Sequence, residues 1–152
     1  MKDYSSYSYD KAKWHYGGDL FPNDLDDIHG FTHTGFYLVW LAENNLISDF
    51  VKQDFATELS ATLNREKGPI HLYEMMDGCL IGDMLNDDGN DFSQTYYEKS
   101  YFGDFEGIFD EVSDIYLVAP TWENYERMSI LIRKRYQKWQ TSKDKKFWQF
   151  WK

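Results

Sequence analysis

Three polar residues near the start of the chain, His15, Asp19 and His33, have side chains that could do chemistry. Histidine and aspartate can bind a divalent metal ion, or act together as a general base and the group that orients it. The four-residue interval of His29 and His33 would suit a zinc site on one helix, but Gly30 indicates that no helix has begun there. The alternative is that His15 and His33 form hydrogen bonds where an N-terminal arm meets the first helix. We favour this structural interpretation, because paired polar groups are often structural.

Two other loops resemble ligand-binding motifs but lack residues that those motifs need. The acidic loop 83–91 resembles a calcium-binding loop. When Gly89 is aligned with the invariant loop glycine, Met84 and Thr95 occupy the positions of the first aspartate and the bidentate glutamate. The glycine pair at 17–18 is followed by an aspartate, whereas phosphate-binding loops need more glycines and a basic residue. The sequence therefore argues against both sites, and we expect no cofactor or metal.

The elements that position these residues are predicted to be mainly helices. Residues 1–30 are polar, aromatic and rich in turn signals, so we expect an irregular arm that lies on the body. Ser48 and Thr121 are suitable N-caps in front of apolar residues at helical spacing. A short apolar run at 114–119 is the one segment that suits a strand. Helices are predicted over residues 32–44, 48–66, 69–77, 91–102 and 121–140.

The length and composition favour one soluble domain with an aromatic core. The chain has 152 residues, enough for one hydrophobic core, and aromatic residues make up 19% of it. Cys79 is the only cysteine, which excludes an internal disulfide and a cysteine-rich zinc site. Residues 1–18 contain no apolar run typical of a signal peptide, so we expect a cytoplasmic protein, as a monomer or weak dimer. We predict a mainly α, single-domain helical bundle over 1–152, in which Trp14 and Tyr16 pack with the two histidines.

Charge is distributed unevenly along the chain. Residues 1–114 carry 23 acidic and 7 basic residues, whereas residues 115–152 carry 3 acidic and 9 basic ones. The net charge of −10 repels phosphate and anionic lipid over most of the surface and attracts basic proteins. We therefore expect a basic protein as partner, and neither nucleic acid nor a membrane.

The predicted docking segment lies between Glu74 and Asp114, within the densest acidic stretch, residues 70–114. It holds 12 acidic residues and one basic residue. Exposed charges mainly set the association rate and its salt dependence, whereas aromatic anchors give lasting affinity. The predicted anchors are Tyr97, Tyr101 and Phe102, and the alternative is that these rings belong to the core. The acidic residues predicted to contact the partner are Asp83, Asp87, Asp88, Asp91, Asp104, Glu106, Asp110 and Glu111.

The basic C-terminal part allows a second interpretation. Residues 133–152 alternate basic residues with tryptophan and phenylalanine, a pattern that can bind nucleic acid or an anionic membrane. We favour instead a helix end that complements its own dipole and the acidic body, because the net field repels polyanions. The basic aromatic tail is predicted to cover residues 141–152.

Five phrases of the sequence together indicate a family. They are KWHYGGD at 13–19, THTGFYL at 32–38, DG at 77–78 together with LNDDGN at 85–90, YY at 96–97 and TWENY at 121–125. Taken together they resemble a bacterial family of uncharacterised small acidic proteins. The chain departs from the family pattern by one additional residue, Leu20, before Phe21 and Pro22. Such proteins are similar in size and charge to immunity proteins encoded beside bacterial toxins, an analogy that transfers no site residues.

The acidic surface, together with the lack of a catalytic motif, favours a binding protein over an enzyme. We expect an immunity protein that neutralises a cognate basic toxin, for example a nuclease, by covering its active site. The alternative is a small enzyme that uses His15, Asp19 and His33, with or without a metal. The two hypotheses differ in one observable, because the enzyme needs these three side chains to converge in an open pocket.

Overall fold

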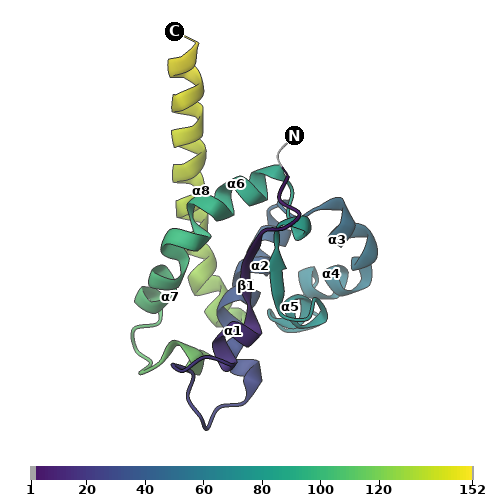
Figure 1. The fold of residues 1–152 in the computed structure, drawn as a ribbon, viewed down its shortest axis with the longest axis vertical. Coiled ribbons are helices and arrows are strands. Elements are labelled where there is room, and N and C mark those ends of the chain that lie inside the picture. Colours follow the sequence, from purple (N-terminus) through teal and green to yellow (C-terminus); the bar gives the residue numbers. More distant parts are fainter. Residues whose placement is uncertain (1–2, 152) are drawn as a thin grey trace.

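The computed structural model describes residues 3–151 and shows a mainly helical protein built around one buried helix (Figure 1). The central helix, α2 (Thr32–Glu43), is buried along its whole length from Thr32 to Ala42. A helix that is apolar all round belongs in the middle of a core. Its large rings, Phe36, Tyr37 and Trp40, are fully buried. The predicted mainly α fold is confirmed, and the helix predicted at 32–44 is its centre.

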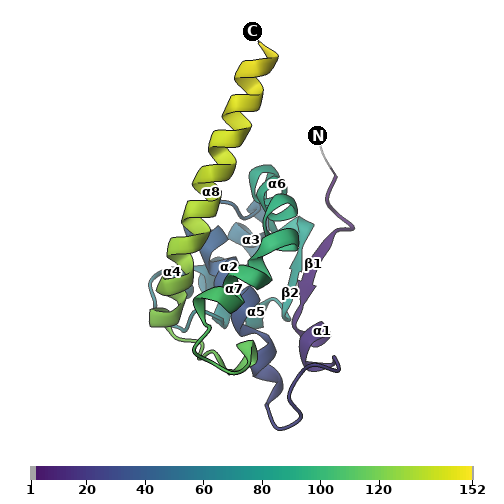
Figure 2. The same ribbon diagram turned by 90° about the vertical axis from the view of Figure 1, so that its left-hand side faces the viewer.

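Short helices and a small β-ribbon surround α2. Helices α4, α5 and α8 contact α2 directly, and α7 packs on α8. The long helix α8 extends beyond the body, so that the C-terminal end lies far from α1 and α7 (Figure 1, Figure 2). The elements, in order, are β1 (Ser8–Lys11), α1 (Ala12–Tyr16), η1 (Asp27–Gly30), α2 (Thr32–Glu43), α3 (Asp49–Asp54), α4 (Ala56–Leu63), α5 (His71–Met75), β2 (Cys79–Ile81), η2 (Gly82–Met84), α6 (Asp87–Thr95), η3 (Tyr97–Tyr101), α7 (Phe102–Ile108), η4 (Ile115–Leu117) and α8 (Trp122–Phe150).

The segment predicted to be an irregular arm contains regular structure. Its strand β1 pairs with β2 in an antiparallel ribbon, with Asp10 opposite Leu80. The register shifts between Ser8 and Asp10. In a regular strand successive side chains point to opposite faces, and a bulge relaxes this alternation. Both Tyr9 and Asp10 are consequently buried, so that a carboxylate is carried into the interior.

The two predicted helix caps are confirmed. The hydroxyl groups of Ser48 and Thr121 each accept a hydrogen bond from the backbone N–H three residues ahead, at 3.4 and 3.2 Å. Such bonds satisfy donors that have no partner within the helix. The helix predicted over 48–66 is nevertheless divided into α3 and α4 at Phe55, whose φ of −118° and ψ of 30° leave the helical region.

The strand predicted at 114–119 is wrong. Residues Ile115–Leu117 form a single turn of 3-10 helix, η4. The Asp114 side chain accepts a hydrogen bond from the backbone N–H of Tyr116 at 2.9 Å. This side-chain bond offers the backbone an alternative to a strand, and it turns the chain.

Residues 87–108 form a nearly continuous helical path in three parts. Helix α6 is capped by Asn86, whose side chain accepts a hydrogen bond from the Gly89 N–H at 2.8 Å. The path continues through the π-helical turn η3 into α7. Aromatic residues recur at four-residue intervals along this path and beyond it, and all are buried. They are Tyr97, Tyr101, Phe105 and Phe109.

The last helix is longer than predicted. Helix α8 runs from Trp122 to Phe150 rather than ending at residue 140. The stripe that packs on the body ends near Tyr136 and Trp139, which contact Phe92 at ring-centroid distances of 5.0 and 5.5 Å. Residues 141–150, in the predicted tail, are therefore an exposed helical extension (Figure 2). Within the part of the chain that the structure describes, no helix has the length and apolar content needed to cross a bilayer.

Candidate functional site

The predicted docking residues do not form one face. They lie along the path from η2 through α6 and α7 to the turn that follows α7 (Figure 1). One group surrounds the start of α6, and the other lies on α7 and after it. The first group is Asp83, Asp87, Asp88 and Asp91. The second group is Phe102, Asp104, Glu106, Asp110 and Glu111.

Two predicted anchors, Tyr97 and Tyr101, belong to the core, and their assignment to the docking surface is wrong. Their exposed fractions are 8% and 1%. The π-helical turn directs both rings inward, where their centroids stack at 5.0 Å. The Tyr97 hydroxyl donates to Asp10 Oδ2 at 2.5 Å, and the Tyr101 hydroxyl donates to the backbone carbonyl of His33. A partner cannot reach either ring in this fold.

Three predicted acidic contacts are already paired with basic residues of α8. Asp104 accepts two hydrogen bonds from Arg135, at 2.8 and 2.9 Å. The carboxylate of Asp88 contacts Lys143 at 2.9 Å. Likewise, Glu111 pairs with Arg127 at 2.6 Å. The basic helix therefore neutralises part of the acidic body, as the sequence favoured.

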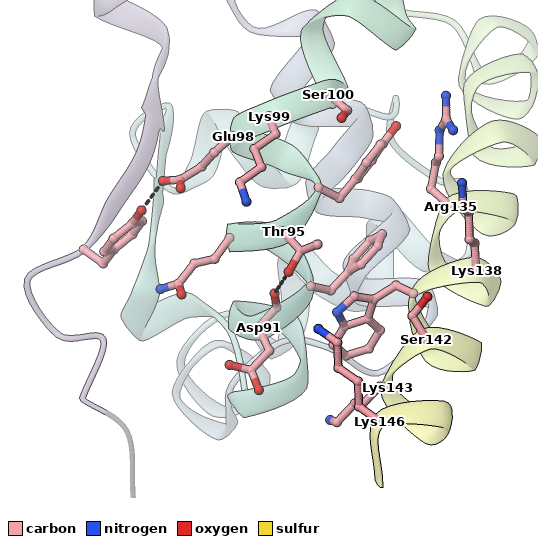
Figure 3. Close-up of a pocket in the computed structure, with 15 residues that line it drawn as sticks. Asp91, Thr95, Glu98, Lys99, Ser100, Arg135, Lys138, Ser142, Lys143 and Lys146 are labelled. Carbon is pink, nitrogen blue, oxygen red and sulfur yellow. Dashed lines mark hydrogen bonds between the residues drawn. The ribbon is translucent and has the colours of Figure 1, made fainter. Parts of the chain in front are cut away.

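Helix α8 also forms one wall of an open groove of 820 Å³ (Figure 3). Aromatic side chains of both walls line it, including Phe92 and Trp139. The α8 wall carries Lys138 and Lys146, whereas the opposite wall carries Glu98 (Figure 3). Together with the exposed end of α8, this wall makes the C-terminal end of the molecule basic.

Asp83 and Asp87 are exposed near the start of α6. The exposed members of the second group that form no ion pair among the described residues, Phe102, Glu106 and Asp110, lie at the opposite end, beside a loop that was not part of the docking prediction. Leu20, in the loop between α1 and η1, meets Phe102, Glu106 and Asp110 around a groove of 470 Å³. Leu20 is 89% exposed and Phe102 is 40% exposed. Both views place this loop and the turn after α7 at the end away from the C-terminus (Figure 1, Figure 2).

We call this surface the acidic end. Its six carboxylates are exposed, and within residues 3–151 none of them forms an ion pair. The run of four aspartates between residues 19 and 27 is the sequence signal that could have identified it. The acidic end consists of Asp19, Leu20, Asp24, Asp26, Asp27, Phe102, Glu106 and Asp110.

A second candidate site lies in the interior, where His15 of α1 and His33 of α2 meet. Their Nε2 atoms are 3.1 Å apart. The predicted proximity of the two histidines is confirmed. The third member is Asp10 of β1, whose carboxylate lies 2.8 Å from His15 Nε2 and 3.3 Å from His33 Nε2. Asp19 lies on the exposed loop instead, so the predicted carboxylate is wrong.

The predicted aromatic junction around the histidines is correct only in part. Phe102 faces both imidazoles, with ring centroids 6.3 Å from His15 and 5.7 Å from His33. Tyr16 packs on Phe31. Trp14 is 52% exposed and does not belong to the junction.

Asp10, His15 and His33 form what we call the His–Asp cluster, and hydroxyl groups surround it. Thr34 and Tyr97 donate to Asp10 Oδ2 at 3.0 and 2.5 Å. The Tyr116 hydroxyl lies 2.8 Å from His15 Nδ1. Burial raises the pKa of Tyr116 to about 12, so this phenol keeps its proton at neutral pH.

The pKa values of Asp10 and His33 are both lowered, which favours an ionised carboxylate beside a neutral imidazole. Burial opposes ionisation of Asp10, but its hydrogen bonds with His15 and His33 outweigh burial and hold the pKa of Asp10 well below its usual range. Burial lowers the pKa of His33, which favours its neutral imidazole. An ionised carboxylate and a neutral imidazole are the forms that ligate metal ions.

The cluster is enclosed rather than open. A cavity of 270 Å³ lies beside it, lined by Asp10, Tyr97, Glu98 and Phe102 among others. Neither histidine lines this cavity, and His33 is 2% exposed. The arrangement does not match the open pocket that the enzyme hypothesis required.

A comparison with protein families places most of this structure in one family. A family model described as a domain of unknown function (DUF7832) matches residues 8–118. The chain belongs to this family. Membership confirms the expected relation to an uncharacterised family. No curated protein and no solved structure matches the chain.

The matched region of the DUF7832 domain contains both candidate sites. It includes the acidic end and all three residues of the His–Asp cluster. Helix α8 lies outside it, although this helix packs on α2 and α7. Both sites therefore belong to the family domain. The basic C-terminal end of the molecule belongs instead to helix α8, which follows that domain.

Proposed function

We propose that this protein binds a basic protein partner through its acidic end and acts as an immunity protein that neutralises a toxin. The observation that supports this proposal is the set of six exposed carboxylates without an ion pair among the described residues. Two of them, Glu106 and Asp110, line the same groove as the exposed side chains of Leu20 and Phe102. The sequence alone favoured the same class of partner. The proposed surface keeps Phe102, Glu106 and Asp110 of the predicted docking segment and adds the loop residues between 19 and 27.

The chemistry of the acidic end suits such a partner. Unpaired carboxylates gathered at one end of a molecule steer a cationic surface toward it and raise the association rate. Charges at the rim of an interface add little lasting affinity, which comes from apolar contacts that lose their water. Leu20 and Phe102 offer such contacts within the same surface.

A nuclease is the kind of toxin that fits these charges best. A nucleic-acid-binding groove presents lysine and arginine to phosphates. Carboxylates spaced along a protein surface can occupy such a groove and exclude the nucleic acid. The proposed mode of inhibition is therefore competition for the phosphate-binding groove.

The test is capture of the partner followed by rescue of growth. The tagged protein is used to capture a basic polypeptide from its native host, and that polypeptide is then expressed in a heterologous bacterium. We expect the captured polypeptide to stop growth and the wild-type protein to restore it. The double variant Glu106→Lys/Asp110→Lys should lose this rescue, because it reverses two carboxylates of the acidic end.

The matched control is Asp54→Lys/Glu66→Lys. Both residues are exposed, lie outside the acidic end and form no ion pair among the described residues. The control changes the net charge by the same amount and should still restore growth. A captured polypeptide without toxicity would contradict the immunity function, and equal loss of rescue in both variants would contradict the role of the acidic end.

A further inference from the structure

We propose that Asp10, His15 and His33 bind a divalent transition-metal ion, with Zn²⁺ as the ion that suits the ligands best. This inference goes beyond the proposed function, because it concerns the interior of the domain rather than the docking surface. Two imidazoles and one carboxylate are a common ligand set for zinc and for other first-row metal ions.

The distances between the ligand atoms are those of atoms that share one ion. The Nε2 atoms of His15 and His33 and the carboxylate of Asp10 are 2.8 to 3.3 Å from one another. Ligands that surround a tetrahedral zinc ion at about 2.0–2.1 Å are about 3.3 Å apart. The side chains therefore need only a small outward adjustment to admit an ion.

Hydrogen bonds alone cannot satisfy all three side chains well. His15 Nε2 faces both Asp10 and His33, but a single N–H on this atom serves only one of them well. If both imidazoles donate to Asp10, two N–H groups face each other across 3.1 Å. A cation at the common point instead accepts the lone pairs of all three groups.

The groups behind the ligands fit the same interpretation. Metal-bound histidines usually hold their second ring nitrogen in a hydrogen bond, which fixes the ring and its tautomer. Tyr116 occupies that position for His15, at 2.8 Å from Nδ1. Thr34 and Tyr97 similarly hold the Asp10 carboxylate in place.

The fold also offers the ion a route to the site. The cavity of 270 Å³ has both Asp10 and Glu98 among the residues that line it. A negative group along the route favours the passage of a cation. Three protein ligands leave a further coordination position for water. An ion bound here would tie β1, α1 and α2 together.

The test is a metal titration of the full-length protein after treatment with EDTA. Co²⁺ serves as the spectroscopic probe and Zn²⁺ as the competitor. We expect one equivalent of Co²⁺ to bind with visible absorption, and Zn²⁺ to displace it. Zn²⁺ at about 100 times its dissociation constant should raise the melting temperature by about 5 °C or more.

Variants identify the ligands. His15→Gln should weaken binding by about 100-fold or more, and Tyr116→Phe by about tenfold, because the phenol only holds the ligand. The matched control is His71→Gln, since His71 lies on α5 outside the cluster, and its affinity should stay unchanged. Circular dichroism shows whether each variant is folded.

The wild-type titration decides the proposal even if a variant fails to fold. Absence of saturable Co²⁺ or Zn²⁺ binding to the wild-type protein would overturn it. Wild-type affinity in folded His15→Gln, or an equal loss of affinity in His71→Gln, would also overturn it, because the ion would then bind elsewhere.

Discussion

Replacing Asp10 with alanine is expected to lower the free energy of unfolding of the metal-free protein by about 3–5 kcal/mol. The carboxylate is buried and contacts His15, His33, Thr34 and Tyr97. Its removal leaves several buried polar groups without their acceptor, and each such group has a large desolvation cost. Urea unfolding followed by circular dichroism measures this change.

Asp19 provides the matched control for this prediction. It is the carboxylate that the sequence placed with the histidines, but it is exposed and forms no ion pair among the described residues. Asp19→Ala should change the free energy of unfolding by no more than about 0.5 kcal/mol. If the two variants have the same stability, Asp10 does not hold the cluster together.

Replacing Trp40 with alanine is expected to cost about 3–5 kcal/mol of unfolding free energy. Trp40 is 1% exposed at the centre of α2. Its ring lies 5.7 Å from that of Phe92 and 5.3 Å from that of Tyr136, so it joins α2 to α6 and α8. Truncation removes these contacts and leaves a cavity that the surrounding helices can fill only in part.

Trp14 is the control for Trp40. Half of its surface is exposed, and the Lys11 ammonium lies over its ring at 5.7 Å from the centroid. Trp14→Ala should therefore cost about 1 kcal/mol or less. Far-UV circular dichroism during urea unfolding compares the two variants without relying on tryptophan fluorescence. Similar losses for both would contradict the central position of α2.

The sequence predicted features that depend on neighbouring residues. The caps at Ser48 and Thr121 use a side chain and a backbone group three residues apart, so the local sequence contains the whole signal. The uneven distribution of charge along the sequence is also present in the fold, because many of the basic residues lie on α8.

Features that depend on distant pairing could not be predicted in this way. The ribbon joins Asp10 to Leu80, and two short strands give little periodic signal. That pairing brings Asp10 into the interior. The sequence therefore did not predict Asp10 as the third member of the His–Asp cluster. The burial of Tyr97 and Tyr101 had a signal, since aromatic residues recur every four positions from 97 to 109. The acidic residues beside Tyr97 and Tyr101 in the sequence led instead to the prediction that both rings lie at the docking surface.

The most direct test of the acidic end is the association rate of the captured partner across a series of salt concentrations. We predict that the wild-type rate falls steeply as salt rises, because exposed charges steer the encounter. At low salt, Glu106→Lys/Asp110→Lys should associate about ten times more slowly and with a weaker salt dependence, whereas Asp54→Lys/Glu66→Lys should stay within about twofold of the wild type. Identical rates and salt dependence in the two double variants would contradict docking at the acidic end.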